Sequence, residues 1–226
     1  MARTAKARRP KLRPDPPDVP ATRDPAPELV ESGDTLDGVE ADADVEVPEH
    51  VADLTLQECR WVGADLSGRS FGGLRCRDTE FVHCDLSGAV LEDAGLTRVR
   101  FTDCRLTGMV LAGATVTDVH IQDSRADLLN LRMAEARYLL VENTALTGAD
   151  FYRFRGEGCG LVGCDLTGVN FADAELSGAY LHGSAIRDVR GALSLRGARI
   201  SADQLVPMGA AVLAALEIEV SDLPTG

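Results

Sequence analysis

Six cysteines have the most evident capacity for chemistry in this chain of 226 residues. Four thiolates at suitable spacing can hold a zinc ion, and two can form a disulfide. No two cysteines stand as Cys-x-x-Cys, whereas Cys84, Cys104 and Cys164 recur at multiples of four five-residue units, or pentads. A free cysteine behaves as a small hydrophobic residue, so this spacing predicts packing in a buried column, with no disulfide and no metal site.

Histidines and glycines offer little more chemistry. The four histidines include no HExxH pattern, and none keeps a constant relation to a Ser or Cys nucleophile. The run Gly156-Glu-Gly-Cys-Gly160 is rich in glycine, but a phosphate-binding loop would follow a strand and open a helix. We interpret it as a locally relaxed or bulged segment. The sequence therefore predicts no catalytic site and no cofactor, and the protein is not expected to be an enzyme.

Acidic side chains form the third group. The formal net charge is -13, and an acidic surface repels nucleic acid and attracts basic proteins. Like charges about 5 Å apart destabilise the fold by roughly 0.8 kcal/mol per pair in water, so stability alone does not explain stacked acids. Acids that recur four pentads apart are therefore candidate partner-binding residues: Glu58 with Asp78, Asp65 with Asp85, and Asp103 with Asp123.

A five-residue period must position all these groups. From Leu56 to Ile186, 23 of the 27 residues at every fifth position are Leu, Phe, Ile, Val or Trp. The exceptions are Cys76, Ala126, Ala136 and Gly156. Neither the helical period of 3.6 nor the strand period of 2 keeps such residues on one face. A chain that turns a corner every five residues would keep them all inside a narrow tube.

Two further regularities support this tube. The residue two positions before each large one is mostly small, as at Ala94 and Cys104. With four corners per coil, residues four pentads apart should stack, which predicts about seven coils. In one column the closing residue of the pentad is glycine, which suits a turn position with positive φ. These glycines are Gly68, Gly88, Gly108 and Gly168.

The units Ala-Asp-Leu-Ser-Gly at 64–68 and Cys-Asp-Leu-Ser-Gly at 84–88 resemble the signature of the pentapeptide repeat proteins. The resemblance covers residues 51–200 and implies an all-β fold, a right-handed quadrilateral β-helix. Several members of this family mimic DNA and occupy the DNA-binding saddle of gyrase or topoisomerase IV, the bacterial type II topoisomerases. The resemblance therefore implies a protein partner, with the six paired acids as the contact. Arginines interrupt the acidic columns: Arg98, Arg100, Arg105, Arg125, Arg132 and Arg137.

Residues 1–50 differ in composition from the repeats. They hold most of the ten prolines, a basic head and then an acidic stretch, with few large apolar residues. Such a composition buries too little apolar surface to offset the entropy of ordering, which predicts a disordered tail. The alternative is that Leu36 and the alternating Val45 and Val47 add a first coil or strand that caps the fold.

Residues 126–140 break the pattern by placing apolar side chains at positions expected to face outward. These are Leu128, Met133, Tyr138 and Leu140. Apolar groups on a polar rod indicate a contact patch, or else a local kink that buries them. A second functional hypothesis follows, in which the rod is a structural module and its partners contact the tail and this patch.

The segment after residue 200 predicts a helix opened by Ser201 and followed by a short strand near 218–220. An apolar stripe recurs at helical spacing and would either cap the last coil or pair with a second copy. The stripe consists of Leu205, Met208, Val212 and Leu216. Residues 197–220 also resemble the end of a mycobacterial fluoroquinolone-resistance member of the family, whose helix makes a two-fold dimer.

No apolar run has the length of a signal peptide or a membrane span. We therefore expect a cytoplasmic protein with reduced cysteines, no contact with membrane and no direct contact with nucleic acid.

Overall fold

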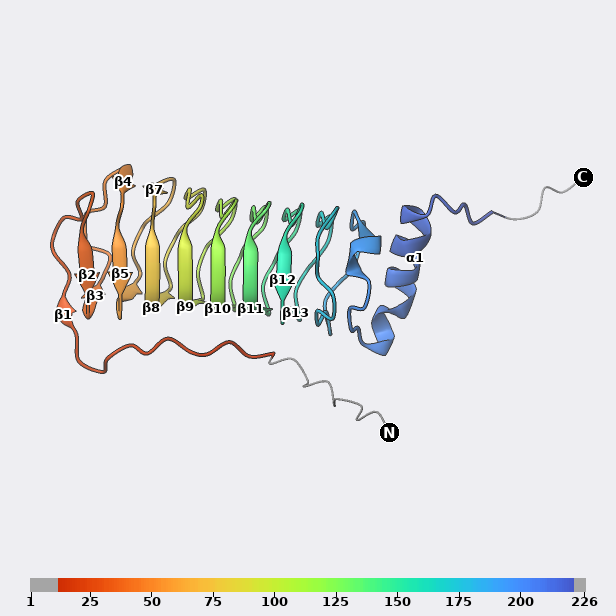
Figure 1. The fold of residues 1–226 in the computed structure, drawn as a ribbon, viewed down its shortest axis with the longest axis horizontal. Coiled ribbons are helices and arrows are strands. Elements are labelled where there is room, and N and C mark those ends of the chain that lie inside the picture. The colour runs from red at the N-terminus through yellow and green to blue at the C-terminus, as the bar shows by residue number, and fades with distance from the viewer. Residues whose placement is uncertain (1–11, 222–226) are drawn as a thin grey trace, which may run out of the picture.

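The structure is a computed structural model, and it describes residues 12–221. Within this range the chain winds into a rod of stacked coils, and helix α1 (Leu205–Ala215) lies at its C-terminal end (Figure 1). No helix in residues 12–221 is long and apolar enough to cross a membrane. Residues 1–11, the basic head of the expected tail, lie outside the described residues.

Strands form the walls of the rod, and all their pairings are parallel. The longest, β8 to β11, each continue around one corner of the rod. Two sheets result, a large one that runs from β1 to β13 and a small one made by β4 and β7, and isolated parallel bridges continue the ladder beyond β13. In chain order the strands are β1 (Asp24–Pro25), β2 (Thr35–Asp37), β3 (Val39–Ala41), β4 (His50–Ala52), β5 (Thr55–Gln57), β6 (Arg60–Val62), β7 (Ser70–Gly72), β8 (Arg75–Val82), β9 (Gly95–Thr102), β10 (Thr115–Gln122), β11 (Glu135–Glu142), β12 (Arg155–Glu157) and β13 (Gly160–Val162).

The register between neighbouring coils is four pentads, as the sequence predicts. Thr35 pairs with Thr55, and Val99 pairs with Val119. The offset is unchanged near the other end of the rod, at the bridge between Asn170 and Arg190. Four corners of five residues account for this repeat, so the predicted solenoid is confirmed.

The core is a set of inward columns. The every-fifth residues from Leu56 to Ile186 are all buried except Gly156, which is half-buried. Residues in neighbouring coils stack directly, so that the ring centroids of Trp61 and Phe81 are 6.4 Å apart and those of Phe81 and Phe101 are 5.0 Å apart. Few aromatic residues suffice, because the tube is narrow and aliphatic side chains fill most positions of the inward columns.

The corners require a backbone conformation that favours glycine. Gly68, Gly88 and Gly108 have φ of 65°, 66° and 69°, which confirms the predicted turn column. The other corners also have positive φ, often at aspartate, as in Asp103 and Asp123 at 51°. Aspartate tolerates this region better than most residues, so it can occupy a corner and still present a carboxylate.

Residues 24–50 join the solenoid in place of the predicted tail. Val30, Leu36, Ala41 and Val47 are buried and belong to the same core. Strands β2 and β3 pair with β5 and β6, so they cover the strand edges that the first regular repeat would expose. The structure thus supports the alternative in which Leu36 and Val47 belong to a first coil.

The C-terminal end is closed by two short 3-10 helices, η1 (Ala192–Leu195) and η2 (Ala202–Gln204), followed by α1. Ser201 and Gln204 form a capping box. The Gln204 side chain is buried, and its Nε2 donates hydrogen bonds of 2.6 Å to the carbonyl oxygens of Leu181 and Ser184. It therefore supplies a donor to the Ser184 carbonyl oxygen and a second donor to the Leu181 carbonyl oxygen, which also accepts a hydrogen bond from the Ser184 N–H.

The short strand expected near 218–220 is not formed. Ile218 and Val220 are exposed and carry no strand assignment. A strand needs a neighbour for its backbone N–H and C=O groups, and the described part of the chain pairs no strand with these residues.

Candidate interaction surfaces

Three of the six candidate acids lie together. Asp65, Asp85 and Asp103 line one surface depression with His83 and Arg105. Asp65 and Asp85 pair across neighbouring coils, as their spacing predicts. Arg105 Nη1 lies 3.7 Å from Asp85 Oδ2, and His83 Nδ1 lies 3.9 Å from Asp103 Oδ2. The depression therefore carries more negative than positive charge, with one arginine and one histidine beside its carboxylates.

Asp123 extends this cluster by one coil. Its Oδ1 accepts a hydrogen bond of 3.2 Å from Asn143 Nδ2. The column of Asp85 continues instead with Arg105 and Arg125, so the stack of acids ends there. We call Asp65, Asp85, Asp103 and Asp123 the acidic face.

The aspartate of the repeat signature also has a local structural role. Asp65 Oδ1 accepts hydrogen bonds from the Ser67 hydroxyl at 2.6 Å and from the Ser67 N–H at 3.0 Å. Asp165 and Thr167 repeat the same two contacts at 2.6 and 3.0 Å. These hydrogen bonds lower the pKa of both carboxyl groups. An aspartate at this position stabilises its own turn, whether or not a partner uses it.

Glu58 and Asp78 lie at a different corner, which the sequence did not separate from the acidic face. Asp78 is buried, and it forms an ion pair with Arg98 in the next coil. Its Oδ1 also accepts a hydrogen bond of 3.0 Å from the N–H of Asp18. Asp78 is therefore not displayed to a partner in this conformation, contrary to the prediction.

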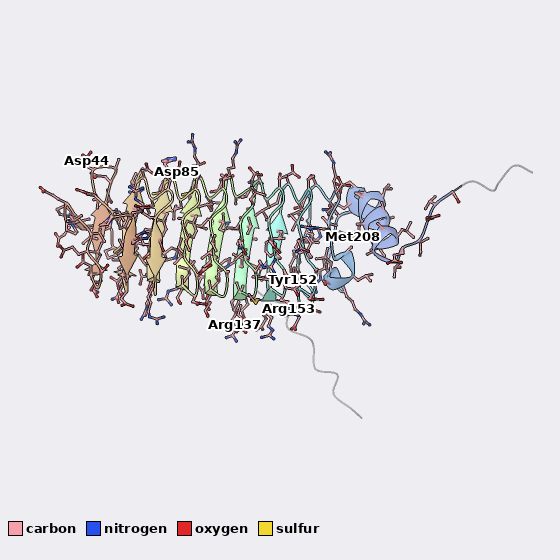
Figure 2. The ribbon with its side chains drawn as sticks, turned by 90° about the horizontal axis from the view of Figure 1, so that it is seen from above. Asp44, Asp85, Arg137, Tyr152, Arg153 and Met208 are labelled. Carbon is pink, nitrogen blue, oxygen red and sulfur yellow. The ribbon has the colours of Figure 1, made fainter. Side chains whose placement is uncertain are left out.

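Charges alternate along another column of the rod. Arg60 lies between Glu40 and Glu80, with nitrogen to oxygen distances of 3.5 and 3.7 Å. Arg100 Nη1 then lies 3.4 Å from Glu80 Oε1. Glu135, Arg155 and Glu175 repeat this pattern elsewhere. The rod thus carries short acidic segments between ion-paired columns, and Figure 2 shows Asp85 and Arg137 on opposite sides of it.

The cysteines are all free thiols in the core. The Sγ atoms of Cys84, Cys104 and Cys164 each donate to a backbone carbonyl 23 residues earlier. Burial raises the pKa of Cys159 and Cys164 to about 11. These two thiols are protonated at neutral pH and are packing groups. Gly156, in the glycine-rich run, is half-buried at a column position that large residues fill elsewhere.

The four apolar residues of segment 126–140 do not form one patch. Leu128, Met133 and Tyr138 occupy three successive corners of a single coil, with φ of 58°, 57° and 59°. Their spacing of five residues is the spacing of corners, so they face three directions. Leu140 is buried outside the main core, because Leu12 packs beside it over Gly160. The prediction of a contact patch is therefore wrong for Leu140, whereas Leu128 and Met133 are exposed, as predicted.

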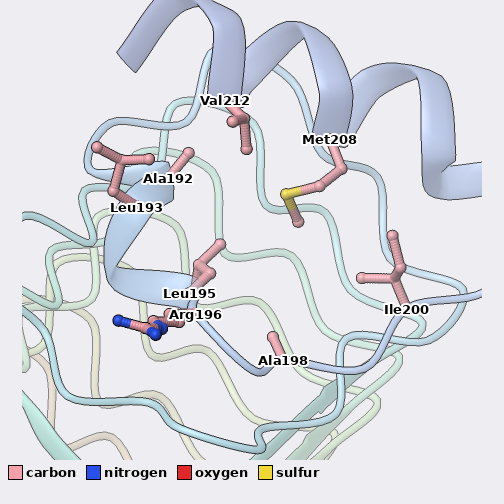
Figure 3. Close-up of a pocket in the computed structure, with 8 residues that line it drawn as sticks. All are labelled: Ala192, Leu193, Leu195, Arg196, Ala198, Ile200, Met208 and Val212. Atoms are coloured by element: carbon pink, nitrogen blue, oxygen red, sulfur yellow. The ribbon is translucent and has the colours of Figure 1, made fainter. Parts of the chain in front are cut away.

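The stripe of the C-terminal helix divides into two pairs. Met208 and Val212 are half-buried and line a pocket between α1 and the last coil, together with Leu195 (Figure 3). Leu205 and Leu216 are 69% and 51% exposed. The helix therefore caps the rod with the middle of its stripe, while both ends of the stripe remain uncovered.

An extended segment against the rod was not predicted. Residues 12–20, which we call the strap, run along the outside of the coils toward β1 (Figure 1). Asp118 and Asp78 accept hydrogen bonds from two of its backbone amides. The four prolines of this segment favour an extended backbone, and this is a signal that the prediction of a disordered tail does not use.

Comparison with known families agrees with the fold. A family model described as a pentapeptide repeat region matches residues 54–131, and one described as pentapeptide repeats in eight copies matches residues 157–190. The chain is a pentapeptide repeat protein. No curated protein matches the sequence significantly.

Two solved structures of other pentapeptide repeat proteins are similar to this chain at low identity. A trypsin-treated variant of QnrB1, a plasmid-mediated fluoroquinolone resistance protein, is 18% identical, with 85% of this chain and 99% of that chain covered and a TM-score of 0.39. HetL, involved in heterocyst differentiation regulation in the cyanobacterium Nostoc, is 18% identical, with 74% and 87% covered and a TM-score of 0.24.

The ion pair of Asp78 makes a testable contribution to the stability of this pentapeptide repeat protein. Burial by itself would raise the pKa of Asp78, but hydrogen bonds from Arg98 and from the Asp18 N–H outweigh it, and the pKa is lowered. Because the folded pKa is the lower one, this stability is present above the unfolded value of about 3.9 and is lost as the pH falls through the folded value.

We therefore expect Asp78→Asn to reduce the free energy of unfolding by about 1–3 kcal/mol at neutral pH. The difference from wild type should shrink as the pH falls below about 4 in urea titrations. Asp103→Asn, at an exposed corner of similar φ, is the matched control and should change stability by less than about 0.5 kcal/mol. An equal loss for Asp78→Asn at pH 7 and in acid would contradict this role for the carboxylate.

Proposed function

We propose that this protein is a non-enzymatic scaffold that binds a protein partner through side chains on the faces of a rigid rod. The proposal rests on the way the columns of the rod separate buried side chains from exposed charged ones. All six thiols are buried in the core, whereas charged side chains stand at fixed intervals outside. A rod of this kind presents its surface groups at a regular coil spacing of about 4.8 Å with little conformational freedom.

The acidic face is the surface we propose for a basic partner. It gathers four carboxylates over neighbouring coils, two of them at corners with positive φ. Regularly spaced negative charge on a rigid rod imitates a nucleic-acid backbone. A DNA-binding surface of a type II topoisomerase, either gyrase or topoisomerase IV, is the concrete partner we propose. The arginines that follow in the same column confine this contact to part of the rod.

A gyrase supercoiling assay tests this proposal. Purified protein at tens of micromolar should inhibit supercoiling or change its sensitivity to a quinolone. Asp103→Asn combined with Asp123→Asn should weaken the effect, and the difference should be smaller at high salt because screening already weakens the charges.

The matched control is Asp93→Asn combined with Asp173→Asn. These residues are also exposed corner aspartates, with φ of 55° and 56°, but they lie on a different corner of the rod. Equal effects of the two double variants would contradict a specific acidic face. No effect of the wild-type protein on gyrase or topoisomerase IV would remove the topoisomerase proposal and leave only the scaffold.

We further propose that the scaffold is a homodimer through α1. Leu205 and Leu216 are exposed at the two ends of the apolar stripe, and Val206, next to Leu205, is 80% exposed. A second copy packed across a two-fold axis would cover these groups. Sedimentation equilibrium should give a dimer for wild type and a monomer for Leu216→Glu. Ala202→Glu, also at an exposed position, should remain dimeric, and a monomeric wild type would contradict the proposal.

A further inference from the structure

The strap makes repeated contacts that match the spacing of the coils. The Asp18 N–H donates to Asp78 Oδ1 at 3.0 Å, and the Asp15 N–H donates to Asp118 Oδ1 at 2.8 Å. The donors are three residues apart, while the acceptors Asp78 and Asp118 are separated by two coils of the rod.

The two repeats have nearly the same length. Three residues of a polyproline II helix advance about 9.3 Å, and they complete one turn. Two coils advance about 9.6 Å at the usual strand spacing. In an extended proline-rich segment, the N–H of every third residue can therefore contact every second coil, without strain in the segment or in the rod. Prolines at 14, 16, 17 and 20 favour this conformation in the strap.

Side chains add an apolar anchor and opposite charge. Leu12 Cδ1 lies beside Leu140 Cδ1 over Gly160, where an added Cβ would meet both atoms at 2.8 and 3.0 Å. Gly160 therefore leaves the space that Leu12 fills. Arg98 lies between the two acceptor coils, and the carboxylate of Asp18 contributes to its electrostatic stabilisation. We call Asp78, Arg98, Asp118, Leu140 and Gly160 the strap face.

The strap is held separately from the solenoid ladder. None of the strand pairings or bridges described for residues 24–199 uses residues 12–20. Just after the C-terminal end of the strap, Arg23 forms an ion pair with Glu40 at 2.6 Å, and Asp24 begins β1. The strap can thus leave the rod while the backbone hydrogen bonds of the coils stay in place.

We propose that the strap face is a binding surface for an extended, proline-rich segment of a partner protein, and that the strap occupies it in the isolated chain. The partner segment would supply a backbone N–H at every third residue to Asp78 and Asp118, and an apolar side chain to the space over Gly160. The strap face lies at a different corner from the acidic face, so binding there does not depend on a topoisomerase partner.

A synthetic peptide of residues 12–23 is the probe. It is titrated into the ¹⁵N-labelled full chain, and binding is followed by amide chemical shifts. In wild type the tethered strap competes, because tethering gives it a millimolar effective concentration. In a chain with Asp15→Pro and Asp18→Pro the tethered strap lacks both N–H donors, and the peptide should bind about tenfold more tightly than to wild type.

Matched variants isolate the hydrogen bonds. A peptide with Asp15→Pro and Asp18→Pro should not bind, whereas one with Asp15→Ala and Asp18→Ala should, since alanine also removes the carboxylates but keeps the amides. In the full chain, adding Asp78→Gly and Asp118→Gly should abolish binding. Glycine suits the positive φ of 50° and 53° there, so the fold is retained.

The control for that change is Asp103→Gly with Asp123→Gly, at corners of φ 51°, which should leave peptide binding intact. Shifts should map to the amides of Arg98, Leu140 and Gly160. Absence of binding to the Asp15→Pro, Asp18→Pro chain at millimolar peptide overturns the proposal. Equal binding of the proline and alanine peptides, or binding that survives Asp78→Gly with Asp118→Gly, overturns it as well.

Discussion

The structure depends on a single constraint, which is that the backbone turns at a corner every five residues while one large side chain of each pentad points inward. Four such corners close a coil, and the coil stacks on the next with a register of four pentads. The corner needs a residue with positive φ, and the tube needs a side chain that fills but does not overfill it. Core, turn and surface positions follow from these two requirements.

Much of the fold was predictable because this constraint leaves a direct trace in the sequence. The unbroken phase from Leu56 to Ile186 identified the inward column, and the glycines at 68, 88 and 108 identified one corner. The first coil was only the alternative to a disordered tail, because its phase slips. Leu36 and Ala41 keep the five-residue interval, but Ala41 and Val47 are six residues apart, and Asp24 pairs with Val39 at an offset of three pentads where the repeats have four. Pairing with β5 and β6 stabilises β2 and β3 despite the composition of this segment. Such pairing cannot be predicted from composition.

The candidate surfaces were only partly predictable, since the sequence gives the column of a residue but not what covers it. Asp65, Asp85 and Asp103 do lie around one depression. Asp78 has the same spacing and the same charge, yet the strap and Arg98 cover it. Leu140 was expected outside and lies under Leu12. Both residues were misplaced for one reason: a segment distant in sequence packs on the rod without contributing to its periodicity.

The most direct test of the account measures the stacking distance itself. Nitroxide labels are attached to Ser67→Cys and Thr167→Cys, which follow the column of bridges from Asp65 to Asp165, while the native thiols are buried. The labels are five coils apart. A pulsed electron–electron double resonance measurement should therefore give one distance of about 24 Å, broadened by the label linkers. A broad distribution, or a main distance beyond about 35 Å, would contradict a chain that completes a coil every four pentads.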